Sequence, residues 1–165
     1  MKQNKTMQIV TTALFAALTL VATLFIRVPL VIGYVNLGDV FVILSAFYLK
    51  KPYCIMSAAV GSALADVLSG YVFYAPATLV IKGLMPIIFL MVLNRFKNKT
   101  SIAPLSLSAF CCEIIMPVGY FLYESILYSL EVRIAALAFN AVQGAVSAVI
   151  AVLLILILNK TKLIK

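Results

Sequence analysis

Long apolar runs constrain this chain more than any other feature of its sequence. A helix needs about 20 apolar residues to cross the hydrocarbon core of a bilayer. Four runs approach or exceed that length: Met7–Ile26, Ala75–Leu93, Ile102–Ile126 and Arg133–Leu158. Two shorter runs, Leu37–Leu49 and Tyr53–Leu68, lie between the first pair. Because 65% of the residues are hydrophobic and only 11% are charged, we predict an all-α integral membrane protein. Its single domain, residues 1–165, would be a bundle of six transmembrane helices.

The first apolar run follows Lys2 and Lys5, an arrangement also found in secretory signal peptides. The run is long enough to span a membrane, however, and no convincing small-residue cleavage site follows it before Arg27. We therefore expect a retained transmembrane helix.

The basic residues predict the orientation of the bundle. A net charge of +8 in a soluble protein would suggest nucleic-acid binding, but here the charges are sorted by side. With both termini inside, the outer side holds only Arg27 and Arg133, and Lys82 lies within a span. The inner side holds Lys2, Lys5, Lys50, Lys51, Arg95, Lys97, Lys99, Lys160, Lys162 and Lys165. The positive-inside rule then predicts cytoplasmic termini, and we expect no nucleic-acid partner.

No catalytic or cofactor-binding constellation is visible. The chain has no His, and Cys54, Cys111 and Cys112 fall within predicted spans, which argues against zinc, haem and His-based acid–base catalysis. No phosphate-binding loop is present, so the chain cannot hydrolyse ATP by itself. We expect no enzyme activity, metal or cofactor. Uphill movement of a solute would need a partner or an ion gradient.

Residues 27–39 connect the first two runs and are mostly apolar although they lie on the outer side. A proline and two glycines prevent one straight helix. A loop at membrane depth needs protein or a cavity to satisfy its backbone, so we expect this segment to fold back over the outer mouth. Asn36 or Asp39 would cap the next helix. That helix is short, which would leave a concavity beneath the segment.

The stretch Gly61–Gly83 places two charges among apolar neighbours, where an uncompensated charge is costly. Asp66 ends one predicted helix and Lys82 lies in the next. The two residues sit at comparable depth, and a lysine side chain can extend toward the surface. We therefore predict an Asp66–Lys82 ion pair. Whether the pair holds two helices in register or contacts a ligand stays open.

Two polar stripes mark the last two long runs. One consists of Glu113, Pro117, Tyr120 and Glu124, whose spacings of four, three and four put them on one helical face. The other consists of Asn140, Gln143, Gly144 and Ser147. Both lie in the outer half and can face one pocket. An acidic residue near the middle of the membrane is expected to have a function, which makes Glu113 a candidate site residue. The alternative, that Glu113 only forms hydrogen bonds within the bundle, stays open. Pro117 should kink its helix.

Ala13 and Ala17 stand four residues apart in the first run. Small residues at this spacing let a second helix approach closely in a membrane. That second helix would belong either to this chain or to a partner.

The order of these motifs resembles the substrate-binding S component of energy-coupling factor (ECF) transporters for vitamins. The resemblance covers nearly the whole chain in length and helix count. The residues that carry it are Ala13-x-x-x-Ala17, Gly33–Asp39 (GYVNLGD), Gly61–Asp66 (GSALAD), Tyr74–Thr78 (YAPAT) and Ile81–Gly83 (IKG).

This resemblance implies a six-helix bundle in a bacterial-type plasma membrane, with a pocket near the outer face closed by the segment between the first two helices. It implies a transmembrane coupling subunit, contacted through Ala13 and Ala17, and two cytoplasmic ATPase subunits. The whole S component would topple in the membrane to release its solute. The expected substrate-binding residues are Asn36, Tyr74, Lys82, Glu113, Tyr120, Tyr123, Asn140 and Gln143.

The resemblance favours a pyridoxine-type or hydroxymethylpyrimidine-type substrate, because the carboxylate of Glu113 suits a small nitrogen heterocycle and the tyrosines supply stacking surface. Pantothenate is an alternative that would favour Lys82 or Arg133, and riboflavin is one that would want a larger apolar slot. A different class of function is a self-sufficient proton-coupled carrier in which Asp66, Lys82 and Glu113 relay protons.

Overall fold

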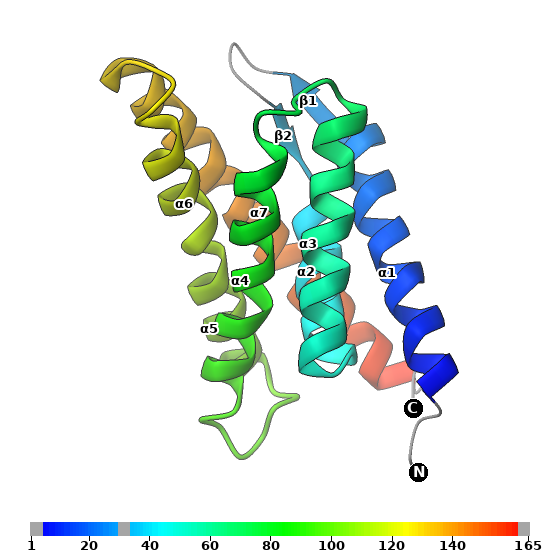
Figure 1. Cartoon of the computed structure of the whole chain (residues 1–165). Helices are drawn as coiled ribbons and strands as arrows, with labels where there is room; N and C mark the ends of the chain where they lie inside the picture. The colour runs from blue at the N-terminus through cyan, green and yellow to red at the C-terminus, as the bar shows by residue number, and fades with distance from the viewer. Residues whose placement is uncertain (1–4, 30–33, 162–165) are drawn as a thin grey trace.

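Seven α-helices and one β-hairpin make up the part of the chain that the structure, a computed structural model, describes: residues 5–29 and 34–161 (Figure 1). The strands β1 (Arg27–Pro29) and β2 (Tyr34–Asn36) pair antiparallel, with Val28 opposite Val35. The helices are α1 (Lys5–Phe25), α2 (Gly38–Tyr48), α3 (Lys51–Leu68), α4 (Ala75–Leu93), α5 (Ile102–Glu113), α6 (Ile115–Glu124) and α7 (Leu130–Thr161).

The predicted count of six helices is confirmed when α5 and α6 are taken as one apolar span over residues 102–124, but in the described part of the chain only four of the six meet the length and apolarity needed to cross a membrane. The spans α1, α4, α5–α6 and α7 are long and apolar enough to cross a membrane. As predicted, α2 is short, with 11 residues. The 32 residues of α7 extend roughly 48 Å at 1.5 Å per residue. This exceeds a hydrocarbon core of about 30 Å, so α7 must tilt or project beyond it.

The interruption between α5 and α6 falls at Ile114, where the sequence predicted a kink caused by Pro117. Proline has no backbone N–H, so Pro117 cannot donate to the carbonyl of Glu113, four residues before it. The ladder of helical hydrogen bonds is lost there and resumes with the amide of Val118, which donates to the carbonyl of Ile114.

A stripe of small residues on α3 packs directly against α1. Ser57, Gly61 and Ala65 lie one turn apart and are all buried. A Cβ atom added at Gly61 would lie 2.6 Å from the backbone oxygen of Ala16 in α1. The two backbones therefore touch, as small residues allow in membrane helix pairs.

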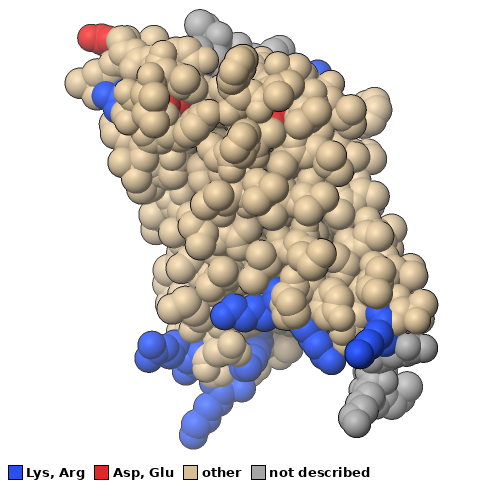
Figure 2. Space-filling model, in the orientation of Figure 1, with Lys and Arg blue, Asp and Glu red and all other residues tan. Residues whose placement is uncertain are grey.

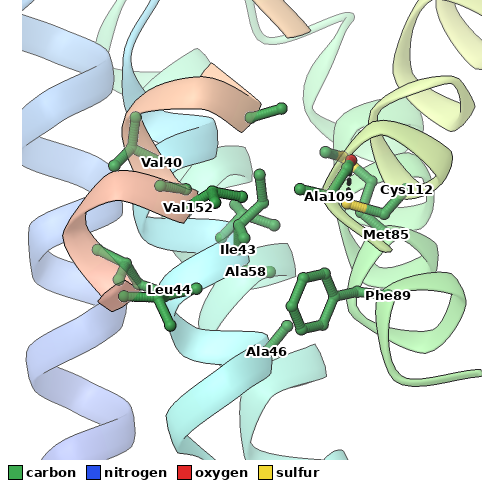
Figure 3. Packing of buried hydrophobic residues seen from close by; sticks show 14 of the residues in the cluster. Val40, Ile43, Leu44, Ala46, Ala58, Met85, Phe89, Ala109, Cys112 and Val152 are labelled. Carbon is green, nitrogen blue, oxygen red and sulfur yellow. Dashed lines mark hydrogen bonds between the residues drawn. The ribbon is translucent and has the colours of Figure 1, made fainter. Parts of the chain in front are cut away.

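The apolar core fills the half of the bundle farther from the hairpin. Eight of its 11 residues are buried, which makes α2 the central helix, and it contacts α1, α3, α4 and α7. The core in and around α2 includes five large side chains with 0% exposed surface: Ile43, Met85, Phe89, Leu105 and Ile155. Figure 3 shows Phe89 and Met85 of α4 facing Ile43 and Ala46 of α2. This dense packing occupies the lower part of the bundle and leaves the end near the hairpin for a polar site.

The two ends of the bundle differ in charge. Helix α1 begins and α7 ends at the same end (Figure 1). Lys and Arg side chains gather at that end, whereas few charges appear at the opposite end (Figure 2). The α2–α3 turn contributes Lys50 and Lys51 to the basic end, and the α4–α5 connection contributes Arg95, Lys97 and Lys99.

Candidate functional site

A cavity lies between the helix ends beneath the β-hairpin. It has residues from α1, β2, α3, α4, α6 and α7 in its wall, so six segments of the chain build one site. The lining residues are Thr23, Tyr34, Asn36, Ser62, Asp66, Tyr71, Tyr74, Thr78, Lys82, Tyr120, Glu124, Ala136, Asn140 and Gln143. Polar groups and aromatic rings thus share its surface, as in sites that bind a small molecule.

Strand β2 of the hairpin contributes Tyr34 and Asn36 to the wall of this cavity, and we call the hairpin the lid, because the sequence predicted that this segment folds over the outer mouth. The hydroxyl of Tyr34 in β2 donates to Asp66 Oδ1 of α3 at 2.6 Å. Burial raises the pKa of Tyr34, and the Asp66 carboxylate raises it further, so the phenol keeps the proton that it donates. The backbone N–H of Asn36 donates to Gln143 Oε1 of α7 at 2.8 Å. The lid is therefore tied to two different helices.

The ion pair predicted between Asp66 and Lys82 is wrong. Lys82 instead pairs with Asp39 of α2, and both side chains are almost fully buried. The Lys82 ammonium also donates to Met116 Sδ at 2.9 Å. Gln143 Nε2 donates to Asp39 Oδ2 at 2.6 Å, so both oxygens of that carboxylate are occupied. The positive charge of Lys82 is therefore neutralised before any ligand arrives.

Asp39 consequently does not cap α2, which is a second correction. Its side chain points into the bundle to Lys82 and Gln143 rather than back to the helix start. Asn36 is not the N-cap residue either, because Leu37 holds that position without a side-chain cap, but Asn36 Oδ1 accepts a hydrogen bond from the backbone N–H of Gly38 at 2.8 Å. Asn36 therefore fixes the entry to α2 with its side chain and ties down the lid with its backbone.

Asp66 is held by neutral donors. Thr78 of α4 donates to Asp66 Oδ2, and Tyr34 donates to Oδ1. The Thr78 hydroxyl also lies 2.8 Å from the hydroxyl of Tyr120 in α6. This chain of hydroxyl groups joins the lid, α3, α4 and α6 around a carboxylate that is only 7% exposed.

A cluster of tyrosines forms the aromatic part of the wall. Tyr74 lies at its centre, with its ring centroid 6.3 Å from Tyr71, 6.2 Å from Tyr120 and 5.7 Å from Tyr123. Tyr34 of the lid lies 5.3 Å from Tyr71. Such tilted aromatic groupings offer ring faces to a planar ligand.

Six of the residues expected to bind substrate line this cavity: Asn36, Tyr74, Lys82, Tyr120, Asn140 and Gln143. Two others are not in its wall. Glu113 is buried beside α7, where a Cβ atom added at Gly144 would lie 3.1 Å from its Oε2. Tyr123 donates through its hydroxyl to the backbone oxygen of Phe73. Contact of these eight residues with a ligand stays a prediction.

Sequence reasoning missed several wall residues. Thr23, Ser62 and Thr78 are polar residues on apolar helices, and the structure buries all three. Their position among apolar residues was the available signal, because a buried hydroxyl needs a hydrogen-bond partner. Tyr34 was hidden in a segment of irregular structure. Glu124 belonged to a recognised polar stripe but was not selected from it, although it lies in the cavity wall.

Ala13 and Ala17 lie on the exposed face of α1, whereas Thr19 is buried and Ala16 packs on Gly61. Within the described residues, the two alanines do not form the close contact between α1 and α3. Their small side chains are available to a second protein.

Fold and cavity together define a membrane-embedded solute-binding protein. Comparison with known proteins identifies its family: residues 3–160 match the model described as ECF-type riboflavin transporter, S component, and the chain belongs to this family. It is a multi-pass plasma-membrane component of an ECF transporter for vitamin uptake, with an ECF module as partner, and it is not an enzyme.

Two individual proteins are also similar. A solved structure described as the S component of a bacterial ECF transporter superimposes with a TM-score of 0.73, covering 98% of this chain and 100% of that one at 19% identity. It supports the fold. An uncharacterised protein from Pyrococcus woesei is 34% identical over 133 residues, which is 79% of this chain and 86% of that protein.

The family description also bears on the substrate. It names riboflavin, which the sequence analysis considered only as an alternative. The comparison therefore favours riboflavin over the pyridoxine-type or hydroxymethylpyrimidine-type substrate that we expected.

Proposed function

We propose that this chain captures riboflavin in the cavity beneath the lid and presents it to an ATP-driven ECF module. The observation that carries the proposal is the tyrosine cluster around Tyr74 in a cavity where Lys82, the one lysine among the described lining residues, is already neutralised by Asp39. Riboflavin is uncharged and contains a large planar ring. A wall of aromatic faces without a free cation suits such a ligand.

The charge of the cavity argues against pantothenate, which is an acid. Lys82 was the residue expected to bind a carboxylate, but its ammonium is paired with Asp39 and directed away from that role. Asp66 and Glu124 add two carboxyl groups to the wall. Bringing an anion into this site would place like charges together in a region of low dielectric constant.

The topology supports capture from outside. The Lys- and Arg-rich end lies opposite the lid (Figure 2), and the positive-inside rule puts that end in the cytoplasm. Both termini are then cytoplasmic and the lid faces outward. The partners in this proposal are a transmembrane coupling subunit, which contacts Ala13 and Ala17, and two cytoplasmic ATPase subunits.

Binding by the purified chain tests the proposal. The protein in detergent is titrated with riboflavin, pyridoxine, hydroxymethylpyrimidine and pantothenate, and the thermal midpoint is measured in each case, because a ligand that binds only the folded form raises it. We expect riboflavin to raise the midpoint most and to bind without ATP. Stabilisation by another vitamin, with no response to riboflavin, would refute the assignment.

A further inference from the structure

Glu124 differs from the other carboxylates at the site in one respect. Asp39 and Asp66 each use both oxygens, the first with Lys82 and Gln143 and the second with Tyr34 and Thr78. Glu124 Oε1 accepts a long hydrogen bond of 3.3 Å from the Tyr74 hydroxyl. Its Oε2 has no partner among the described residues, although Glu124 is only 4% exposed.

No ion pair of the described chain engages this oxygen, although the charge of Arg133 acts on the Glu124 carboxylate from a greater distance. The ion pair found in that part of the chain joins Lys82 to Asp39 and leaves Glu124 out. Arg133 stacks over the ring of Phe121, with its guanidinium carbon 4.9 Å from the ring centroid, and none of its nitrogens lies within 4.0 Å of Glu124. A buried acceptor without a donor is costly, and this one lies in the wall of the cavity.

The surroundings of Glu124 indicate what would supply the donor. Tyr74 both donates to Glu124 and stands 6.2 Å from Tyr120, so the carboxylate lies beside the aromatic wall. A planar ligand stacked there brings its polar edge or its side chain close to Oε2. Riboflavin offers two kinds of donor, the imide N–H of its ring and the hydroxyl groups of its ribityl chain. A hydrogen bond from either to a carboxylate is charge-assisted and strong.

We propose that Glu124 is a specificity-determining residue that accepts a hydrogen bond from an N–H or O–H group of the bound ligand. This inference rests on the proposed function for the identity of the ligand. The hydrogen bond itself requires only that the ligand carry an N–H or O–H donor at this position. A purely supporting role, in which Glu124 only fixes the Tyr74 ring, would need Oε1 and would leave Oε2 unused. The site consequently selects ligands that carry a donor at this position.

The test compares the wild type with Glu124→Gln, which keeps the shape and removes the charge. Affinities are measured for riboflavin, for lumiflavin, which lacks the hydroxylated chain, and for 3-methylriboflavin, which lacks the imide N–H. We expect Glu124→Gln to weaken riboflavin binding by roughly tenfold or more. Glu131→Gln is the matched control, because Glu131 is an exposed acid at the start of α7, and it should leave binding unchanged.

The three flavins locate the donor. If the wild type and Glu124→Gln bind lumiflavin with equal affinity, the donor is a hydroxyl of the ribityl chain. If they bind 3-methylriboflavin with equal affinity, the donor is the ring N–H. Wild-type affinity of Glu124→Gln for riboflavin would overturn the inference, and so would an equal loss for all three flavins, which would indicate general damage to the cavity. Should Glu124→Gln not fold, Glu124→Asp decides the question, because it keeps the charge and withdraws the oxygens by one methylene group.

The wild-type measurements separate this inference from the proposed function. A wild type that binds pyridoxine but no flavin refutes riboflavin as the substrate. The affinities of the wild type and of Glu124→Gln for pyridoxine are then measured, and their ratio is compared. A tenfold loss with that vitamin still supports Glu124 as the acceptor, and an unchanged ratio overturns it.

Discussion

At the scale of single residues, buried charge determines what this site can bind. Lys82 and Asp39 meet with side-chain exposures of 5% and 1%. Two charges removed from water are stable together only because each has the other and further hydrogen bonds to Met116 and Gln143. The pair therefore acts as one neutral polar unit in the wall between α2, α4 and α7.

Removing one member of this pair should be more harmful than removing both. Lys82→Met leaves the Asp39 carboxylate buried without its cation, and we expect the free energy of unfolding to fall by about 3–5 kcal/mol. The double variant Lys82→Met with Asp39→Asn should lose less than Lys82→Met alone, because no buried charge is left without a partner. Unfolding by SDS in mixed micelles measures these values. The exposed Lys97→Met is the control, with a change of less than about 0.5 kcal/mol, and additive losses in the double variant would contradict the pair.

The sequence predicted which residues of this site are polar better than it predicted their partners. Lys82, Tyr120, Asn140 and Gln143 stood out as polar residues within apolar runs, and Asn36 and Tyr74 came from the resemblance to the family; all six line the cavity. Lys82 was paired with Asp66 because the two lie on successive helices at similar depth. The actual partner, 43 positions away, could be found only from how α2 packs in the centre of the bundle.

At the scale of elements, the lid is held by a small number of hydrogen bonds. Tyr34→Phe removes the donor to Asp66 Oδ1 without changing the ring that packs on Tyr71. We expect bound riboflavin to dissociate roughly five- to tenfold faster, since a hydrogen bond of this kind contributes about 1–1.5 kcal/mol. Stopped-flow dissociation measures the rate. Tyr53→Phe, at the opposite end on α3, should leave it unchanged, and equal rates for the wild type and Tyr34→Phe would show that the lid is held elsewhere.

The contact between α1 and α3 has its own test. Gly61→Ala places a methyl group 2.6 Å from the Ala16 backbone oxygen, which cannot move aside as a side chain can. We expect a loss of about 1–3 kcal/mol in the free energy of unfolding. Gly83→Ala is the matched control, because its Cβ would lie 3.5 Å from Ala59 Cβ, an ordinary contact. Equal stability of the two variants would mean that α1 and α3 can separate freely.

The exposed face of α1 should mediate partner contact. Replacing both Ala13 and Ala17 by leucine adds bulk to that face, and we expect riboflavin binding to be retained while co-purification with the coupling subunit falls at least tenfold. The control changes Ala141 and Ala145 to leucine, two exposed residues of α7 with the same spacing. Retention of the complex by the α1 variant, or its loss in the control alone, would contradict docking through α1.

Element boundaries were the most predictable part of the fold. The apolar runs predicted the bounds of all six helices to within a few residues, and Pro117 predicted the interruption of the fifth, because both effects are local. The hairpin was predicted as a lid but not as a pair of strands. Its pairing places Arg27 opposite Asn36. The strand β2 is also attached to Asp66 and Gln143, which no short stretch of sequence reveals.

At the scale of the whole molecule, membership of the S component family implies that energy comes from a partner. Proteoliposomes that contain this chain alone should therefore not accumulate riboflavin when a proton gradient is applied. Uptake of labelled riboflavin measures this, with vesicles that also contain the ECF module and ATP as the positive control. Accumulation by the chain alone would support the proton-coupled carrier, for which Asp66, Lys82 and Glu113 were considered.

The packed core below the cavity has a further consequence. Ile43, Phe89, Leu105 and Ile155 have no exposed surface and pack at the end of the bundle opposite the lid, so the cavity has a closely packed apolar floor. Within the described residues, an apolar core packed this closely offers no polar groups along which water, protons or ions could cross. A cell can therefore keep many copies of this subunit in its membrane, unattached to any energising module, without dissipating its ion gradients.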